Sequence, residues 1–328
     1  MRRISKNLAI LVSVLVVVCL AVGSVGCSST SSEEYPSKPI TLVVPWGAGG
    51  STDVTGRAIA DVAEKTLGQP VVVKNREGGS STIGTQEVAN ADGDGYTILV
   101  ATINALAILP HTLDLQNTPA DFKGVGRVAV RDIAVVTTSD KPWNDMADFI
   151  EDAKKNPGAY SFATPQGGLQ HLVFEQVMQA AGFEATLYPV QGDAEGLTAV
   201  LGGTADLQVP GSYNVAKGQM DAGEMKALAV FSEVRAEALP DTPTLIELGY
   251  DVSVYPWTTL LLPATTPDDV VKQVQDAFKV VLNDPELIDL LERSGQTPMY
   301  LDGDAAMEAI QAEYERFGQT VEAVGLGK

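Results

Sequence analysis

Short β-branched runs alternate with amphipathic stretches along the chain from residue 40 onward. Five segments form the first series: strands at 40–44, 71–74 and 96–102, and helices at 53–67 and 82–90. Strands that alternate with helices usually pair in parallel, with helices packed on both faces of the sheet. The series therefore predicts an α/β lobe.

A second series of the same kind begins near residue 133. It predicts strands at 133–136, 160–163, 186–190 and 205–209, and helices at 145–155, 169–181 and 194–201. Extended runs follow at 226–231 and 252–262, and helices are predicted at 268–283, 286–293 and 303–324. The pattern predicts two lobes joined by crossing strands near 137 and 252. Lobe 1 is expected to comprise 36–137 and 253–328, and lobe 2 to comprise 138–252.

The N-terminal segment has the layout of a secretory signal. Arg2, Arg3 and Lys6 precede an uncharged apolar stretch that ends near Val22, and small residues follow. The stretch is short for a bilayer span of roughly 20 residues, although a permanent membrane anchor is the alternative. We predict a signal peptide at 1–26 and an extracytoplasmic location.

Cys27 lies where a lipoprotein signal peptidase would leave it as the first residue. The motif resembles a lipobox, with Gly26 before the cysteine but Ser24 where leucine is commonest, so ordinary cleavage nearby is the alternative. We predict lipidation of Cys27, with 27–35 as a flexible tether that holds the protein at the membrane surface. The only other cysteine, Cys19, lies in the signal, so we expect no disulfide and no thiolate metal site.

Composition indicates a globular protein of 328 residues with 45% hydrophobic residues. The formal net charge of −20 argues against binding to nucleic acid, which requires neutralisation of phosphates by cations.

The stretch Pro45-Trp46-Gly47-Ala48-Gly49-Gly50-Ser51-Thr52-Asp53 forms a glycine-rich turn between a predicted strand and a predicted helix. It lacks the lysine of a phosphate-binding loop and the spacing of a dinucleotide fingerprint, so nucleotide binding is not expected. The remaining backbone N–H groups at the helix start suit a carboxylate. The alternatives are a tight turn without a ligand and helix capping, which we favour for Asp53.

A second glycine loop, at 164–170, occupies the matching strand-to-helix junction of the second lobe. Both loops follow the carboxyl ends of strands, where ligands of open α/β sheets bind. We therefore expect them to face each other across a cleft.

Enzymatic motifs are missing from the sequence. His111 and His171 are its only histidines, and it contains neither a GxSxG elbow nor an HExxH pair. We expect packing or capping by His171, and we predict no catalytic residue, metal or cofactor.

The chain resembles substrate-binding proteins of the tripartite tricarboxylate transporters, the Bug family, from Tyr35 to Leu326. The matching segments are YPSKPITLVVPWGAGGSTD (35–53), LGQPVVVKNREGG (67–79), DGYTILVAT (94–102), the HL pair at 171–172, LPDTPTLIELGY (239–250) and LLPATTPDDVVKQV (261–274). The resemblance implies a two-lobed periplasmic-binding-protein (Venus flytrap) fold, each lobe a mostly parallel sheet flanked by helices.

The resemblance also implies a function and a site. The protein would act as a monomer that captures a small di- or tricarboxylate, amino acid or aromatic acid for integral-membrane permease subunits. A membrane sensor kinase is an alternative partner, and an extracytoplasmic hydrolase or lyase is a more distant alternative. The implied ligand-binding residues are Trp46, Gly47, Ala48, Gly49, Gly50, Ser51, Thr52, Ala101, Thr102, Thr164, Pro165, Gln166, Gly167, Gly168, Pro189, Val190, Gln191, Gly192 and Asp206.

Some positions depart from the family pattern. Ala105, Ala163 and Val190 replace polar or aromatic residues, and Pro165 replaces a glycine. Glu77 replaces the usual proline and either adds negative charge near the cleft or points into solvent.

Overall fold

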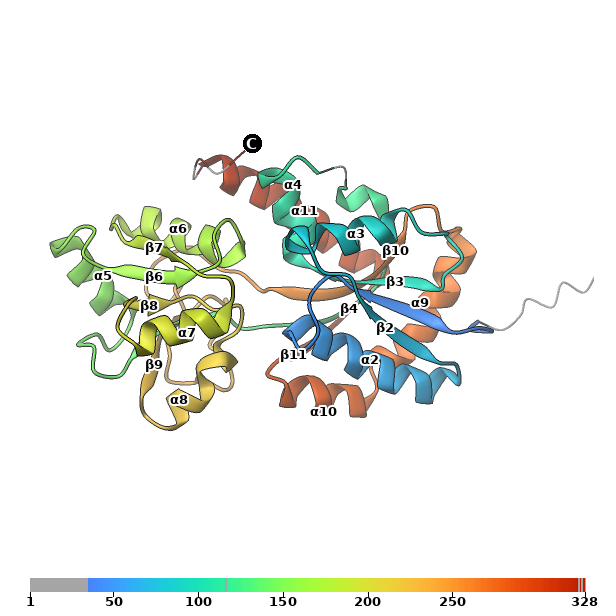
Figure 1. Cartoon of the computed structure of the whole chain (residues 1–328), viewed down its shortest axis with the longest axis horizontal. Coiled ribbons are helices and arrows are strands. Elements are labelled where there is room, and N and C mark those ends of the chain that lie inside the picture. Colours follow the sequence, from blue (N-terminus) through green and yellow to red (C-terminus); the bar gives the residue numbers. More distant parts are fainter. Residues whose placement is uncertain (1–34, 116, 324, 326, 328) are drawn as a thin grey trace, which may run out of the picture. The chain divides into compact units, whose positions relative to one another are not determined.

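The computed structural model describes residues 35–115, 117–323, 325 and 327. The predicted signal, Cys27 and the tether up to residue 34 lie outside the described residues. Within the described part, two sheets and their flanking helices form an α/β fold, as predicted (Figure 1). None of the described helices combines the length and apolar character needed to cross a bilayer.

The first sheet has six strands in the order β11-β4-β10-β3-β1-β2. Their bounds are β1 Ile40–Val44, β2 Val71–Asn75, β3 Thr97–Thr102, β4 Phe122–Val130, β10 Trp257–Pro263 and β11 Thr297–Asp302. β1 pairs in parallel with β2 and β3, whereas β10 is antiparallel to both β3 and β4, and β11 is antiparallel to β4. Strands β1 to β4 therefore share one direction, and β10 and β11 run against it.

The second sheet has five strands in the order β7-β6-β8-β5-β9. Their bounds are β5 Ala134–Thr138, β6 Ser161–Thr164, β7 Thr186–Pro189, β8 Leu207–Gln208 and β9 Met225–Val230. β6 pairs in parallel with β7 and β8, and β5 is antiparallel to β8 and β9. Both sheets are therefore mixed, but most strands in each share one direction, as the predicted α/β fold requires. β5 is the first strand of the second sheet after the first crossing segment, and β10 is the first strand of the first sheet after the second crossing segment. Each runs antiparallel to both of its neighbours.

Two crossing segments, 131–133 and 231–256, connect the sheets within the unit formed by residues 35–328. Backbone hydrogen bonds hold the segments together, from Arg131 N–H to the Pro256 carbonyl (2.8 Å) and from Phe231 N–H to the Ile133 carbonyl (3.0 Å). The boundary predicted at 137 is too late, because β5 already pairs with β9 from Ala134 onward. The second predicted boundary, at 252, falls within the second crossing segment.

Both crossing segments run between the same edges of the two sheets. β4 ends, and the antiparallel β10 begins, at the edge of the first sheet where β1, β2 and β3 end. In the second sheet, β5 begins and β9 ends at the edge where β6, β7 and β8 end. The carboxyl-end edges of the two sheets are thus directly connected.

Helices and short helical turns cover the sheets (Figure 1). Those of the first lobe are α2 Ser51–Leu67, η1 Gly79–Ser81, α3 Thr82–Ala89, η2 Asn104–Ile108, α4 Leu109–Thr112, η3 Pro119–Asp121, α9 Asp268–Leu282, α10 Pro285–Arg293 and α11 Gly303–Ala323. Those of the second are α5 Met146–Lys155, α6 Leu169–Ala181, α7 Asp193–Leu201, η4 Tyr213–Ala216 and α8 Lys217–Asp221.

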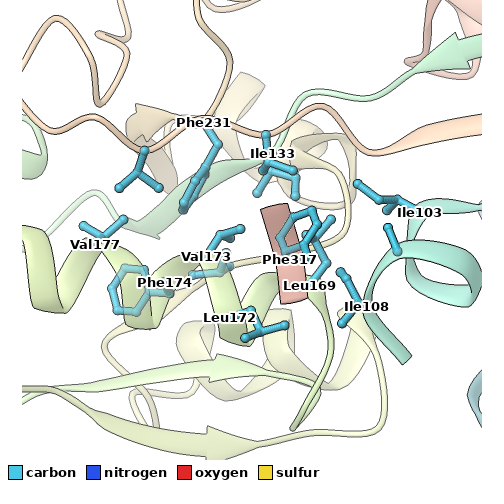
Figure 2. Close-up of a cluster of buried hydrophobic side chains, with 14 of the residues drawn as sticks. Ile103, Ile108, Ile133, Leu169, Leu172, Val173, Phe174, Val177, Phe231 and Phe317 are labelled. Carbon is cyan, nitrogen blue, oxygen red and sulfur yellow. The ribbon is translucent and has the colours of Figure 1, made fainter. Parts of the chain in front are cut away.

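One buried apolar cluster extends across both lobes. Figure 2 shows side chains of α6 beside Ile108 of η2, Phe317 of α11, and Ile133 and Phe231 of the crossing segments. A hydrogen bond of 3.0 Å from Gln176 on α6 to Thr320 on α11 lies beside this cluster. Apolar burial therefore stabilises the contact between the lobes as well as each lobe.

Candidate functional site

The first glycine loop connects β1 to α2 at the carboxyl-end edge of the first sheet. Gly49 has φ +82°, a left-handed conformation that favours glycine, and Gly50 is the N-cap of α2 without a capping side chain. Asp53, at the third helical position, accepts the Gly49 N–H through Oδ2 at 2.8 Å. The capping role expected for Asp53 is thus confirmed.

The second glycine loop repeats this arrangement between β6 and α6. Gly167 has φ +75°, Gly168 is the N-cap, and His171 Nδ1 accepts the Gly167 N–H at 3.1 Å. Burial lowers the pKa of His171, partly opposed by Glu175, whose Oε1 lies 3.4 Å from Nε2. A neutral imidazole that accepts at Nδ1 carries its proton at Nε2, facing Glu175. His171 therefore packs and caps, as predicted.

A third loop, between β7 and α7, has the same bond. Gln191 N–H donates to Glu195 Oε2 at 2.7 Å, and Gly192 is the N-cap. In all three loops, a side chain at the third helical position accepts the N–H of the residue before the N-cap. This bond fixes the loop, whereas the N–H groups of the first helical turn have no partner within the helix. At α2 and α6, these groups include those of Ser51, Thr52, Leu169 and Gln170.

Asp53 also connects the first loop to β2. Asn75 Nδ2 donates to Asp53 Oδ1 (2.8 Å) and to the Trp46 carbonyl (3.0 Å), and Arg57 Nε donates to Asp53 Oδ2 (2.9 Å). Burial raises the pKa of Asp53, but the hydrogen bonds from Arg57, Gly49 and Asn75 outweigh it, so the pKa lies below its ordinary value. The ionised carboxylate therefore stabilises the loop.

We expect Asp53→Asn to lower the free energy of unfolding by about 1–3 kcal/mol at pH 7, because bonds to a charged acceptor are lost. A carboxyl with a lowered folded-state pKa stabilises the protein above its unfolded pKa, and this contribution is lost as pH falls through the folded pKa. The difference between wild type and variant should therefore shrink below about pH 4. Urea unfolding at several pH values measures it. Asp61→Asn, on the exposed face of α2, is the matched control, and a difference that is constant with pH would contradict the assignment.

The side chain of Glu77 is exposed to solvent, and its carboxylate also lies beside the first glycine loop. Its Oε2 is 2.7 Å from the position that a Cβ on Gly47 would occupy. Nearby, Ser80 and Ser81 have positive φ values of 54° and 88°, which are uncommon for residues other than glycine. The segment after β2 thus places a carboxylate beside the loop.

Of ten buried polar atoms without a hydrogen-bond partner among the described residues, seven lie at the two carboxyl-end edges. In the first sheet they are Trp46 Nε1, Ser81 Oγ, Thr102 Oγ1, Asn104 Oδ1, Arg131 Nε and Trp257 Nε1, and in the second sheet Gln208 Oε1. The other three are the hydroxyls of Ser232, Thr259 and Thr266. All seven residues end a strand, follow one or, for Trp257, begin the antiparallel β10. Since buried polar atoms are nearly always satisfied in proteins, this concentration indicates a place where polar groups from outside the chain bind.

Most predicted residues lie at these edges. Residues 46–52 and the pair Ala101 and Thr102 lie at the edge of the first sheet, and residues 164–168 and 189–192 lie at that of the second. Two contribute to the sheet itself, because Thr164 Oγ1 donates to the Val209 carbonyl (3.1 Å) and Val190 is buried in an apolar cluster.

Asp206 does not join them. Its carboxylate accepts hydrogen bonds from Ser161 N–H (2.9 Å) and Lys141 Nζ (2.6 Å). Ser161 begins β6, whereas the glycine loop follows its last residue, Thr164, so Asp206 lies at the opposite end of that strand. The prediction of Asp206 as a site residue is therefore corrected: it ties β8 to β6 and Lys141.

Sequence reasoning missed Arg131. It follows β4 directly, and its Nη1 donates to Ser51 Oγ at 2.5 Å. A cationic residue directly after a buried strand could have indicated this position. The pattern of the sequence did not predict β4, so the position was not recognised.

Neither the hollow on the surface of the first lobe nor a metal-binding cluster among the described residues marks the site. A hollow of about 540 Å³ lies along α2, β2 and α10, and none of the predicted residues lines it. No group of three or more His, Cys, Asp or Glu side chains in the described ranges is arranged to hold a metal ion.

Comparisons with known proteins agree on one family. The model of the tripartite tricarboxylate transporter family receptor matches residues 55–326. A UPF0065 protein of Bordetella pertussis is 31% identical over 304 residues, covering 91% of this chain and 93% of the relative. The structure of the periplasmic binding protein BugD is 29% identical, covers 90% of this chain and 100% of its own, and has a TM-score of 0.76. The R. palustris protein Rpa4515, solved with adipate, is 28% identical, covers 89% and 99%, and has a TM-score of 0.78.

Proposed function

Because the chain belongs to the tripartite tricarboxylate transporter receptor family, we propose that it captures a small carboxylate outside the cytoplasm and delivers it to permease subunits of such a transporter. The family is one of solute-binding receptors rather than enzymes. Lipidation of Cys27 would keep the protein beside its permease.

The arrangement of donors supports a carboxylate ligand. The first turns of α2 and α6 present N–H groups at the positive ends of their helix dipoles, and neither N-cap has a side chain to occupy them. Seven of the ten buried polar atoms without a partner lie at the same edges. This coincidence is the observation that carries the proposal, since helix N-termini bind anions through backbone N–H groups.

The number of ligand charges is limited by the first loop. Glu77 brings a carboxylate against Gly47, which disfavours a further ligand carboxylate at that position. We therefore favour mono- and dicarboxylates over tricarboxylates. The adipate in the structure of Rpa4515 supports this choice.

A thermal-shift screen tests the proposal. At a concentration of 100 Kd, a ligand stabilises the folded protein by about 2.7 kcal/mol, which we expect to raise Tm by about 5–10 °C. Linear dicarboxylates from succinate to azelate form the panel, with citrate for comparison, and adipamide is the uncharged control.

Two outcomes would contradict the proposal. Folded protein whose Tm is unchanged by every mono-, di- and tricarboxylate would refute carboxylate capture. Chemical conversion of the ligand, detected by mass spectrometry after prolonged incubation, would indicate an enzyme instead.

A further inference from the structure

Arg131 occupies the start of the first crossing segment. Its backbone N–H is bonded to the Pro256 carbonyl, so both crossing segments fix its position. Its guanidinium reaches the first residue of α2, where Nη1 donates to Ser51 Oγ. The side chain therefore extends along the carboxyl-end edge towards the uncapped start of this helix.

The charge of Arg131 lacks a close counter-ion. Among residues 35–115 and 117–323, no carboxylate lies within ion-pair distance of its guanidinium, and Nε is screened from solvent without a partner. Burial lowers the pKa of Arg131, and the carboxylate of Asp193 opposes this only in part. Arg131 is half-buried, and even partial removal of a cation from water costs free energy unless another group compensates.

An anion beside Ser51 would satisfy this charge. A guanidinium offers N–H groups in a planar fork that binds a carboxylate through two parallel hydrogen bonds. The N–H groups of Ser51 and Thr52 lie at the same helix start, where the helix dipole also favours negative charge. The fork and the helix start are complementary to one carboxylate group.

We propose that Arg131 is the charged contact that selects a ligand with a terminal carboxylate, an inference that rests on the proposed function. The guanidinium binds that carboxylate together with the first-turn N–H groups of α2. Asp193, the acidic side chain that acts on Arg131, already accepts the Gly211 N–H at 3.0 Å, and the carboxylate of Glu77 lies against Gly47. The ligand therefore binds with its carboxylate at Arg131 rather than at Glu77.

Calorimetric titration of Arg131→Met with adipate, or with the dicarboxylate that gives the largest thermal shift, tests this assignment. We expect Kd to rise about 100-fold, because one partner of a buried charge pair is lost. The Tm without ligand should be unchanged or slightly higher, because a half-buried charge without a counter-ion is removed. Arg131→Lys, which keeps the charge but not the fork, should raise Kd about 10-fold.

Controls separate this inference from the proposed function. Arg127→Met removes the arginine of β4, whose Nε donates to the Met299 carbonyl, and should leave Kd unchanged. If Arg131→Met binds as tightly as wild type, Arg131 does not contact ligand, although carboxylate capture stands. If only Arg131→Lys does, the charge contributes but the two-bond fork does not, which overturns that part of the assignment. A lowered Tm without ligand together with unchanged Kd would make Arg131 a structural residue. If the wild type binds no carboxylate, both ideas fail.

Discussion

Replacing Ser51 with proline is expected to weaken carboxylate binding about 10- to 100-fold while α2 stays folded. Proline is favoured at the first helical position, and Gly50 before it is extended (φ −74°, ψ 164°), as a residue preceding proline requires. The substitution removes one N–H donor, and a hydrogen bond to a charged group contributes about 1.5–3 kcal/mol. Calorimetric titration with adipate measures the change.

Ser51→Ala is the matched control. Both variants lose the hydroxyl that accepts from Arg131, but only the proline variant loses the backbone N–H. The ratio of their dissociation constants therefore isolates the contribution of the N–H group. Equal affinities in the two variants would show that this N–H does not bind the ligand.

Replacing Gly124 with alanine is expected to destabilise the protein by about 3 kcal/mol, which corresponds to a decrease in Tm of about 5–10 °C. A methyl group on Gly124 of β4 would overlap the backbone of Gly303 at the start of α11, and the reverse also holds. The backbone has little room to adjust, because Gln275 on α9 also donates to the Gly124 carbonyl at 2.8 Å. Differential scanning calorimetry measures the loss.

Gly218 in α8 provides the comparison, because a Cβ there would meet no atom within 4 Å. Gly218→Ala should leave Tm unchanged or slightly higher, since alanine is the better helix former. A Tm for Gly124→Ala within about 2 °C of the wild type would contradict the close approach of β4 and α11.

Glycines of β4 explain why part of the fold could not be predicted. Gly124 and Gly126 interrupt the β-branched pattern of this strand, so sequence periodicity predicted no strand between 122 and 130. Those glycines are required by neighbours distant in the sequence, including Gly303 and Leu301. The helix predicted at 169–181, by contrast, is confirmed to the residue, because its apolar spacing and the glycines at both ends are local signals.

The candidate site divides in the same way. The glycine loops could be located because a turn between a strand and a helix is formed by consecutive residues. Arg131 could not, since its importance depends on the end of a strand that was itself missed. Asp206 was placed at the wrong edge because strand β8 has only two residues, and sequence gives little indication of which end such a strand presents.

The structure reveals a spacing in the sequence that marks the acceptors at the third helical position. Asp53, His171 and Glu195 each lie four residues after the loop residue whose N–H they accept. Their chemistry differs, so a search for one residue type would not have connected them.

The strand order also determines when each lobe can be completed during synthesis and export. Residues 134–230 supply every strand of the second sheet, whereas the first sheet requires β10 between β3 and β4. Domains generally fold as units as the chain emerges. The second lobe is complete once residue 230 has emerged, but β3 and β4 have no strand to join them until residue 263 has followed. A chain with this topology therefore completes its second sheet before the sheet that its first strands belong to.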